Sequence, residues 1–312
     1  MRIISFSTQD TDWKSPRMGI ILYADGHDIG ERLDCEKLFE PADRPRDPLA
    51  WFDMGDRWFQ AARDTARQLE RDANARAQAR DKGWLVPRQD AYWHAPVPRP
   101  GKIVCIGLNY RDHAAESGLA VPEKPVVFSK FSSCVIAPGE EVVIPTTSEK
   151  VDYEAELAVV IGRHAKHVKA SDAYDYVLGY TAFNDVTARD FQFGDGQWQR
   201  GKSCDTFAPM GPTIVTTDEI PDPHTLRISL KLNGNTMQDS NTNQLIFGIP
   251  QLIEFITAST TLEPGDVIAT GTPAGVGFAR KPPVFLKPGD EMQVLIDGIG
   301  GLGNPVVAEQ EN

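Results

Sequence analysis

Basic residues are in deficit in this sequence. Its 312 residues include 44 Asp and Glu against 32 Lys and Arg, which gives a formal net charge of −12. Sequence-independent binding of nucleic acid needs clustered Lys and Arg, and docking on an anionic membrane needs positive charge as well. Long hydrophobic runs are also missing, and none approaches the ~18–20 apolar residues of a membrane-spanning helix. We therefore expect neither nucleic acid nor a membrane among the partners.

Cysteine is scarce as well. The four cysteines are far apart in the sequence, and no two of them form a C-x-x-C pair. In a chain of this length they indicate neither a disulfide framework nor a thiolate zinc site. Residues Met1–Asp10 lack the long apolar stretch of a signal peptide. These features predict reduced cysteines and a cytoplasmic location.

The first 95 residues combine strand and helix signals. An apolar run before Asp25-Gly26 predicts a β-hairpin, because this dipeptide favours the tight turn between two strands. Ala61–Arg80 is rich in Ala, Arg, Gln and Glu, and it predicts a helix whose interspersed charges face solvent. The prolines of Trp84–Gly101 are typical of a connector. We predict a small N-terminal α+β domain over residues 1–95.

The sequence changes in character from residue 100 to residue 312. Short β-rich runs alternate with turns that contain Gly and Pro. Only two windows strongly favour a helix, Asn109–Gly118 and Pro250–Thr260. These signals predict one β-rich α+β domain over residues 100–312.

Two apparent nucleotide-binding motifs lack the flanking structure that they need. Gly196–Ser203 fits the P-loop pattern G-x4-G-K-[ST], but no apolar strand precedes it, and Pro and Gly exclude a helix after it. Gly298–Gly303 fits G-x-G-x-x-G, but Asn304-Pro305 follows, with too few residues beyond for the rest of a dinucleotide-binding unit. We reject nucleotide binding at both and interpret the second as a glycine-rich turn between strands.

The strongest candidate for chemistry is the acidic segment Val151–Val160. In a strand, Asp152, Glu154 and Glu156 would point to one face and repel one another. A solvent-facing edge strand would accommodate them, but they lead directly into the apolar run LAVVIG, and carboxylates beside a core strand need a cation. Asp185 ends another apolar run and offers a third oxygen ligand. Two Glu and one Asp, without nearby Cys or His, suit Mg²⁺ or Mn²⁺ in a catalytic site with open positions.

His113 and Glu116 form the second candidate. If a short helix ends at Gly118, the two residues are i, i+3 neighbours on one face. A carboxylate beside an imidazole fixes its tautomer and makes it a general base near neutral pH, whereas an ordinary surface pair is the alternative. His164 and His167 lie in a loop rich in Lys and Arg without carboxylates, and we interpret them as surface histidines.

Several further polar residues could hold an anionic substrate. They are Lys130, Arg189, Gln192, Arg200 and Lys202. Together with a metal they could build a local cationic pocket in an acidic protein, although single Lys and Arg residues usually lie on the surface. The small-residue loop Ala269–Gly277 follows a strand, and its hydroxyl and N–H groups could bind a carboxylate or form a plain turn.

Taken in order, these segments resemble the fumarylacetoacetate hydrolase family. The matching pieces span about Lys102–Asn304 and are GLNYRDHAAE, DYEAELAVVIG, GYTAFNDVTARDFQ, RGKSCDTFAPMGP, LEPGDVIATGTPAGVG and KPGDEM. The resemblance implies a catalytic domain of mixed sheets, rolled into a barrel-like core with few helices, and a homodimer. The longer members supply an additional metal-binding Asp just ahead of the dyad, but Ile103–Tyr110 contains no carboxylate here. The sequence is therefore more similar to the smaller acylpyruvase-like and diketo-acid-processing members.

Carried over by position, the resemblance implies roles for individual residues. The implied Mg²⁺ or Mn²⁺ ligands are Glu154, Glu156 and Asp185. The implied catalytic residues are the lid-borne dyad His113 and Glu116, together with Lys202. The implied substrate contacts are Arg189, Gln192, Thr272, Lys130 and Thr206.

The site and the resemblance together predict a metal-dependent enzyme for a small anionic 2-oxo or 2,4-dioxo acid. We expect hydrolytic cleavage of a C–C bond in an acylpyruvate or a sugar-derived diketo acid, by a water that His113 deprotonates. The alternative is oxaloacetate decarboxylation, or hydration or isomerisation of an unsaturated 2-oxo acid, with the same metal site. A P-loop protein or a metal-binding module without catalysis fits these residues less well.

Overall fold

The computed structural model describes residues 1–9, 16–40, 43–44 and 48–310. Within these residues the chain forms large mixed sheets with few helices, which confirms the predicted α+β, β-rich class. In the described part of the chain the largest sheet is an open path of strands and does not close on itself. The expected barrel-like core is therefore corrected to open, packed sheets.

The N-terminal part contains the predicted hairpin. Its strands are β1 (Arg2–Ser7), β2 (Arg17–Ala24), β3 (His27–Asp34), β4 (Leu85–Pro87) and β5 (Tyr92–His94). Between β2 and β3, Asp25 and Gly26 have φ angles of 51° and 78°, the left-handed conformation that a tight hairpin turn requires. The expected connector also carries structure, because β4 pairs with β3 and β5 pairs with β1.

The predicted charged helix is divided in two. The N-terminal helices are α1 (Pro48–Asp53), α2 (Gly55–Arg71) and α3 (Ala73–Asp81). Asp72 separates the last two, because its backbone is extended and its side chain accepts the N–H groups of Asn74 and Ala75 at the start of α3. One face of α2 is buried through Trp58, Ala62, Ala66 and Leu69, a helical spacing that packs this otherwise charged helix against β2.

The largest sheet joins the N-terminal strands to the rest of the chain. Its main path is β4-β3-β2-β1-β14-β12-β11-β17-β6-β7, with β5 and β8 paired at its side. The further strands are β6 (Ile103–Gly107), β7 (Val126–Lys130), β8 (Val135–Ile136), β11 (Ala155–Ile161), β12 (Val177–Asn184), β14 (Ala208–Thr216) and β17 (Val267–Ala269). Because β1 pairs directly with β14, the sheet continues across the predicted boundary near residues 95–100, and that boundary stays a prediction.

Two smaller sheets complete the β structure. A five-stranded sheet has the order β16-β15-β18-β19-β9, and β10 pairs with β13 alone. These strands are β9 (Val142–Ile144), β10 (Val151–Asp152), β13 (Thr187–Ala188), β15 (Arg227–Leu232), β16 (Asn235–Asn241), β18 (Glu291–Ile296) and β19 (Gly300–Ala308). The glycine-rich motif Gly298–Gly303 lies at the β18–β19 turn and the start of β19, as interpreted from the sequence.

Four helices follow residue 100 in the described chain. They are α4 (Arg111–Ser117), α5 (Arg189–Gly194), α6 (Gln199–Lys202) and α7 (Ile249–Thr257). The first and last lie where the sequence predicts them, and α4 ends at Gly118 with a φ of 64°. The other two were not expected, because six and four residues are too few to show a helical period. Within the described residues no helix is both long and apolar enough to cross a membrane.

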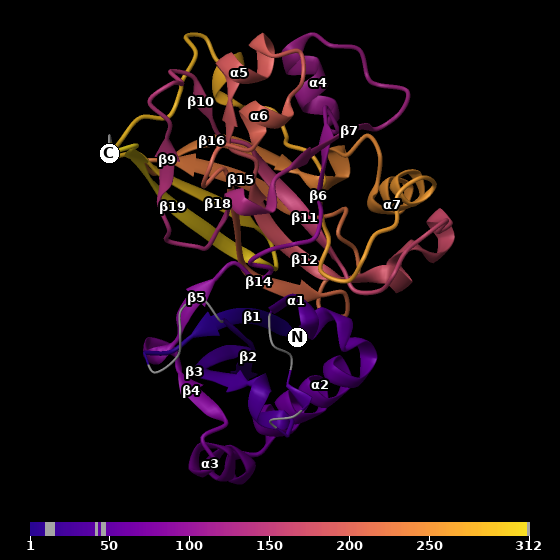
Figure 1. The fold of residues 1–312 in the computed structure, drawn as a ribbon, viewed down its shortest axis with the longest axis vertical. Helices are drawn as coiled ribbons and strands as arrows, with labels where there is room; N and C mark the ends of the chain where they lie inside the picture. The colour runs from indigo at the N-terminus through magenta and orange to yellow at the C-terminus, as the bar shows by residue number, and fades with distance from the viewer. Residues whose placement is uncertain (10–15, 41–42, 45–47, 311–312) are drawn as a thin grey trace.

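Figure 1 shows how these elements are distributed. The N-terminal strands and helices occupy one end of the molecule, at the bottom of the view, and α4, α5 and α6 gather near its opposite end. The P-loop-like segment Gly196–Ser203 follows α5 and contains α6, so it lacks the strand that such a loop requires before it. His164 and His167 are both exposed, as expected of surface histidines.

Candidate metal and catalytic site

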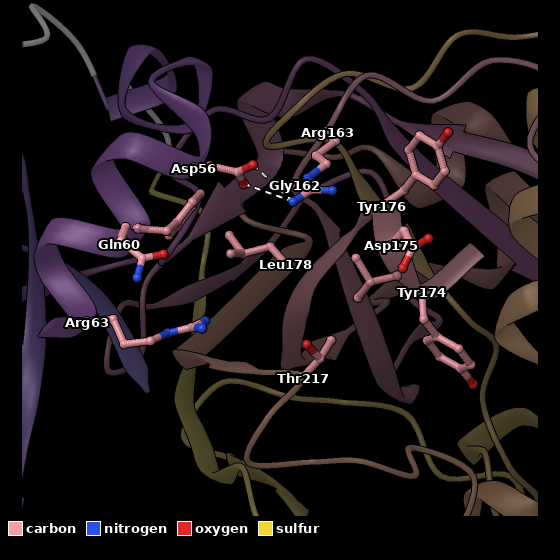
Figure 2. Close-up of a pocket in the computed structure, with 12 residues that line it drawn as sticks. Asp56, Gln60, Arg63, Gly162, Arg163, Tyr174, Asp175, Tyr176, Leu178 and Thr217 are labelled. Carbon is pink, nitrogen blue, oxygen red and sulfur yellow. Dashed lines mark hydrogen bonds and ion pairs between the residues drawn. The ribbon is translucent and has the colours of Figure 1, made fainter. Parts of the chain in front are cut away.

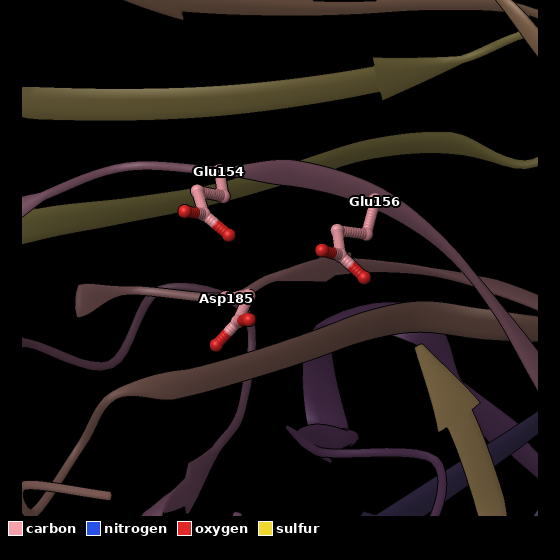
Figure 3. A group of neighbouring side chains, drawn as sticks. All are labelled: Glu154, Glu156 and Asp185. Carbon is pink, nitrogen blue, oxygen red and sulfur yellow. The ribbon is translucent and has the colours of Figure 1, made fainter. Parts of the chain in front are cut away.

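Three buried carboxylates gather where β11 and β12 run side by side. Glu154 immediately precedes β11, Glu156 lies within it, and Asp185 follows the last residue of β12. One ligand atom from each lies within 4.8 Å of the others, and Figure 3 shows Glu154 and Glu156 extending from one segment and Asp185 from its neighbour. The exposed fractions are 5%, 1% and 0%, which excludes the solvent-facing edge strand.

Asp152 is separate from this group, although an uninterrupted strand would put it on the same face. Tyr153 and Glu154 lie between β10 and β11 and belong to neither strand, so the alternation of side chains is broken there. The Asp152 carboxylate instead accepts the Arg189 Nε–H at 2.9 Å and the Gly277 backbone N–H at 2.8 Å.

Two buried lysines compensate part of the negative charge. Lys202 Nζ donates to Glu154 at 2.7 Å and to Asp185 at 2.6 Å. Lys130 Nζ donates to the other Asp185 oxygen at 2.6 Å. The lysine of the P-loop-like motif therefore holds the protein's own carboxylates, a function unrelated to phosphate. Burial disfavours the charged form of Lys202, but Asp185 and Glu154 outweigh it and raise its pKa.

Arg189 is the third buried cation. Its guanidinium lies 2.7 Å from Glu154 Oε1, and its Nη1–H donates to Gln192 Oε1 at 2.9 Å. Burial alone would raise the pKa of the Glu154 carboxyl, but Lys202 and Arg189 reverse the effect and lower it to about 2. The local cationic pocket expected from the sequence is thus a set of ion pairs, in which Arg189, Lys202 and Lys130 are already bound to acids. The expected Arg200 is not among them, because it pairs with Asp195 in an exposed contact.

Glu156 carries the charge that these cations leave uncompensated. Four carboxylates, including Asp152, face three cations, and among the described residues Glu156 forms no ion pair. Its carboxylate accepts the backbone N–H of Gly271 at 2.9 Å. Burial raises the pKa of the Glu156 carboxyl well above its usual range, and Asp185 and Glu154 add to the rise. The group is thus one positive charge short of neutrality, and a divalent cation could supply positive charge at this point.

His113 and Glu116 are neighbours in the structure, as their spacing predicts, and their catalytic role stays a prediction. His113 Nδ1 lies 3.4 Å from Glu116 Oε2 on α4, at the i, i+3 spacing. His113 is buried, at 8% exposed, whereas Glu116 is exposed, so the pair lies at the boundary between the interior and the surface. Glu116 also accepts the Gly275 N–H with both oxygens at 3.0 Å, so a loop from a distant part of the sequence fixes it from the other side. The imidazole and the carboxylate group are close enough for a positive charge on His113 to favour ionised Glu154.

The loop Ala269–Gly277 binds carboxylates, as the sequence suggested, but they belong to the protein. Its N–H groups reach Glu156 from Gly271, Glu116 from Gly275 and Asp152 from Gly277. The hydroxyl of Thr272 accepts from Gln238 at 2.8 Å, and the hydroxyl of Thr206 accepts the Val143 N–H at 2.8 Å. The substrate-binding roles implied for these two threonines, and for the other site residues, stay predictions.

Three buried amides hold the site together and were missed in the sequence. Gln238 accepts the Ala155 N–H at 2.8 Å and donates to Thr272 and Pro273. Asn184 accepts the Glu154 N–H at 3.0 Å. Asn109 donates to the carbonyls of Thr270 and Phe247. Asn184 and Asn109 adjoin candidate residues in the sequence. Gln238 lies in an edge strand, where no neighbouring residue in the sequence indicates a role in the site.

A separate cavity of about 400 Å³ lies between α2 and the chain around Tyr174–Leu178. Figure 2 shows Arg163 paired with Asp56 across it, at 3.0 Å. Both side chains are more than half exposed, so this ion pair contributes little stability. The cavity contains none of the candidate catalytic residues.

The family model described as fumarylacetoacetate (FAA) hydrolase C-terminal matches residues 102–307. A protein of Rattus norvegicus named as a mitochondrial oxaloacetate tautomerase is 51% identical over 224 residues, which are 72% of this chain and 72% of the rat protein. The location in that name belongs to the rat protein, and the cytoplasmic location of this chain stays a prediction.

Two solved structures share the fold over nearly the whole chain. A fumarylacetoacetate hydrolase from Exiguobacterium antarcticum is 33% identical, with a TM-score of 0.77 over 99% of this chain and 100% of that one. A 5-carboxymethyl-2-hydroxymuconate delta-isomerase from Mycobacterium smegmatis is also 33% identical, with a TM-score of 0.72 over 100% of both chains. Proteins similar to this chain therefore carry both hydrolase and isomerase names.

Proposed function

Since this chain belongs to the fumarylacetoacetate hydrolase family, we propose that it is a divalent-metal-dependent enzyme that interconverts the keto and enol forms of a small 2-oxo dicarboxylic acid such as oxaloacetate. Support for the substrate comes from the name of the rat protein, at 51% identity. Support for the chemistry comes from one observation: the loop that binds Glu116 of the His113–Glu116 pair through Gly275 also binds Glu156, in a buried carboxylate group that lacks one positive charge.

Glu154, Glu156 and Asp185 would hold the metal. They fit a hard divalent cation, because all donors are carboxylate oxygens and because the buried Glu156 has no cation of its own among the described residues. Mg²⁺ and Mn²⁺ both suit this ligand set. Bound there, the metal supplies a Lewis acid that polarises the 2-oxo group and stabilises negative charge on its oxygen.

His113 would move the proton. In the keto-to-enol direction, its Nε2 accepts a proton from C3 of the substrate. Solvent water then gives a proton to the 2-oxo oxygen to complete the enol, and the His113 imidazolium returns its proton to solvent. Glu116 accepts from Nδ1 and so keeps Nε2 available as the base, while Gly275 fixes Glu116. Lys202 Nζ stands beside Glu154 and Asp185 as a fixed positive charge close to the developing oxyanion.

The experiment is to follow oxaloacetate with purified protein and Mg²⁺. We expect faster decay of the enol absorbance and faster exchange of the C3 protons for deuterium, while total oxaloacetate is unchanged. Matched samples with EDTA and with the His113→Gln variant serve as controls. Enol decay at the uncatalysed rate in all samples would rule out the proposal.

Hydrolytic C–C cleavage of a 2,4-dioxo acid is the second candidate, and the Exiguobacterium structure named as a hydrolase favours it. The same imidazole that takes a carbon-bound proton can deprotonate a water. Release of pyruvate and a second carboxylic acid from acylpyruvates would support hydrolysis. Release of pyruvate and CO₂ from oxaloacetate would support the decarboxylase alternative, and hydration of an unsaturated 2-oxo acid would support the hydratase alternative. The homodimer is likewise a proposal, which the molar mass in solution tests.

A further inference from the structure

Among the described carboxylates near the site, Asp152 accepts the most hydrogen bonds, yet it has no role in the proposed chemistry. It is fully buried, with an exposed fraction of 0%. Oδ1 accepts the N–H groups of Tyr153 and Gly277, each at 2.8 Å. Oδ2 accepts the Phe278 N–H at 3.0 Å and the Arg189 Nε–H at 2.9 Å. The Arg189 Nη2 also lies 2.9 Å from Oδ2, as part of the ion pair.

One set of these contacts leads to the proposed metal ligands. Arg189 is bound by Asp152 along one edge, and its Nη2 reaches Glu154 Oε1 at 2.7 Å. The Phe278 ring covers the guanidinium, with its centre 4.3 Å from the Arg189 Cζ. A guanidinium held on an edge and on a face has one orientation, so Asp152 determines where Arg189 meets Glu154.

The other set leads to the dyad. Gly277 is the last residue of the loop Ala269–Gly277, and Phe278 follows it. Gly275, two residues before Gly277, donates to Glu116. No side chain fits at Gly277, because a Cβ atom there would lie 2.4 Å from Asp152 Oδ1 and 2.0 Å from the Val284 carbonyl oxygen. The loop therefore packs closely against Asp152, and this contact determines the position of the Gly275 N–H that binds Glu116.

We propose that Asp152 is a positioning residue that aligns the metal-binding carboxylates with the His113–Glu116 dyad, through Arg189 on one side and the loop end Gly277–Phe278 on the other. It touches neither substrate nor metal. The role rests on the proposed function, since it concerns the alignment of that site. An amide cannot replace the carboxylate, because the side-chain NH₂ introduced by Asp152→Asn would face N–H donors that need an acceptor.

Asp152→Asn is the test, and Asp266→Asn is its matched control. Asp266 is also 0% exposed and also accepts two backbone N–H groups and one cation, from Lys102 and Glu263, but it has no contact with the site. Both variants and the wild type are compared by melting temperature, by Mn²⁺ titration with electron paramagnetic resonance, and by kcat and KM for oxaloacetate enol decay.

We expect Asp152→Asn to melt at a lower temperature and to lose function once folded. It should bind one Mn²⁺ per chain with weakened affinity, and its kcat should fall about 10–100-fold, the usual range for residues that orient metal ligands. Asp266→Asn should keep the wild-type kcat and Mn²⁺ affinity. Equal kcat and equal Mn²⁺ affinity in the two folded variants would overturn the positioning role.

Arg189→Lys keeps the test decisive if Asp152→Asn does not fold. A lysine retains the charge but cannot reach Asp152, Glu154 and Gln192 together, so it should reproduce the loss of kcat and of Mn²⁺ affinity. Wild-type values for both quantities would overturn the proposal. A wild-type protein that binds no Mn²⁺ and does not accelerate the decay of the oxaloacetate enol would instead overturn the proposed function.

Discussion

Glu116 and Gly275 are joined by a forked hydrogen bond, in which one backbone N–H meets both carboxylate oxygens at 3.0 Å. The two residues are 159 positions apart in the sequence, and the bond fastens helix α4 to the loop that follows β17. It gives the His113–Glu116 pair a fixed place relative to the carboxylate group.

Gly275→Ala should therefore disable the dyad. Gly275 has a φ of +102°, and a Cβ there would lie 2.2 Å from the Met237 carbonyl oxygen, so the loop must move. Since displacements of about 1 Å can cost about 100-fold, we expect kcat to fall by that order. Gly234→Ala is the control, because it has a similar φ of +80° with no atom within 4 Å of its Cβ. Equal kcat in the two variants would contradict the prediction.

Glu156→Gln should stabilise the metal-free protein while removing metal binding. Burial, with help from Asp185 and Glu154, raises the pKa of the Glu156 carboxyl well above its usual range, so its ionised form costs stability at neutral pH. A neutral amide avoids that cost. We expect the melting temperature in EDTA to rise on the order of a few °C, and the stabilisation by Mn²⁺ to vanish.

Glu154→Gln should change the metal-free stability in the opposite direction. Although burial opposes its ionisation, Lys202 and Arg189 lower the pKa of the Glu154 carboxyl to about 2, so its charge stabilises the fold. The amide leaves two buried cations short of a partner, and we expect the melting temperature in EDTA to fall. If the melting temperature in EDTA shifts in the same direction for Glu154→Gln and Glu156→Gln, the site does not have the charge balance described above.

His113→Gln should separate catalysis from metal binding. Loss of a general base typically costs about 10²–10⁴-fold in rate, and we expect enol decay to slow by that order. The Mn²⁺ affinity should stay within about threefold of wild type, because the proposed ligands are unchanged. A variant that retains wild-type turnover would remove His113 from the mechanism.

His94 should make the protein less stable in mild acid. Burial lowers the pKa of His94 in the folded protein, with a smaller opposing effect of Glu140, so the unfolded chain binds the proton more readily. The free energy of unfolding should therefore decrease as the pH falls below about 6.5, the unfolded-state value. Urea unfolding at pH 7.5 and at pH 5.5 measures this, and His94→Gln should reduce the difference. The exposed His27→Gln is the control and should leave it unchanged.

The sequence predicted those local features that depend on a few adjacent residues, such as a tight turn or the end of a helix. The hairpin at Asp25-Gly26 and the helix that ends at Gly118 are both present, because each depends on residues next to one another. The division of the charged helix at Asp72 was missed, because the local composition favours helix on both sides of a residue that caps the second helix.

The order of amino acids establishes which residue types are available: three carboxylates in two apolar segments, a His and a Glu at i, i+3, and lysines far from both. Their partners depend on how the chain folds. Lys202 meets Glu154 across 48 residues, and Asp152 turns from the carboxylate group to Arg189 and Gly277 because the strand is interrupted after it. The interaction energy of two charged groups depends on the distance between them and on their burial, and folding of the chain determines both. A sequence pattern can therefore identify candidate charged residues, but it cannot predict which of them form pairs.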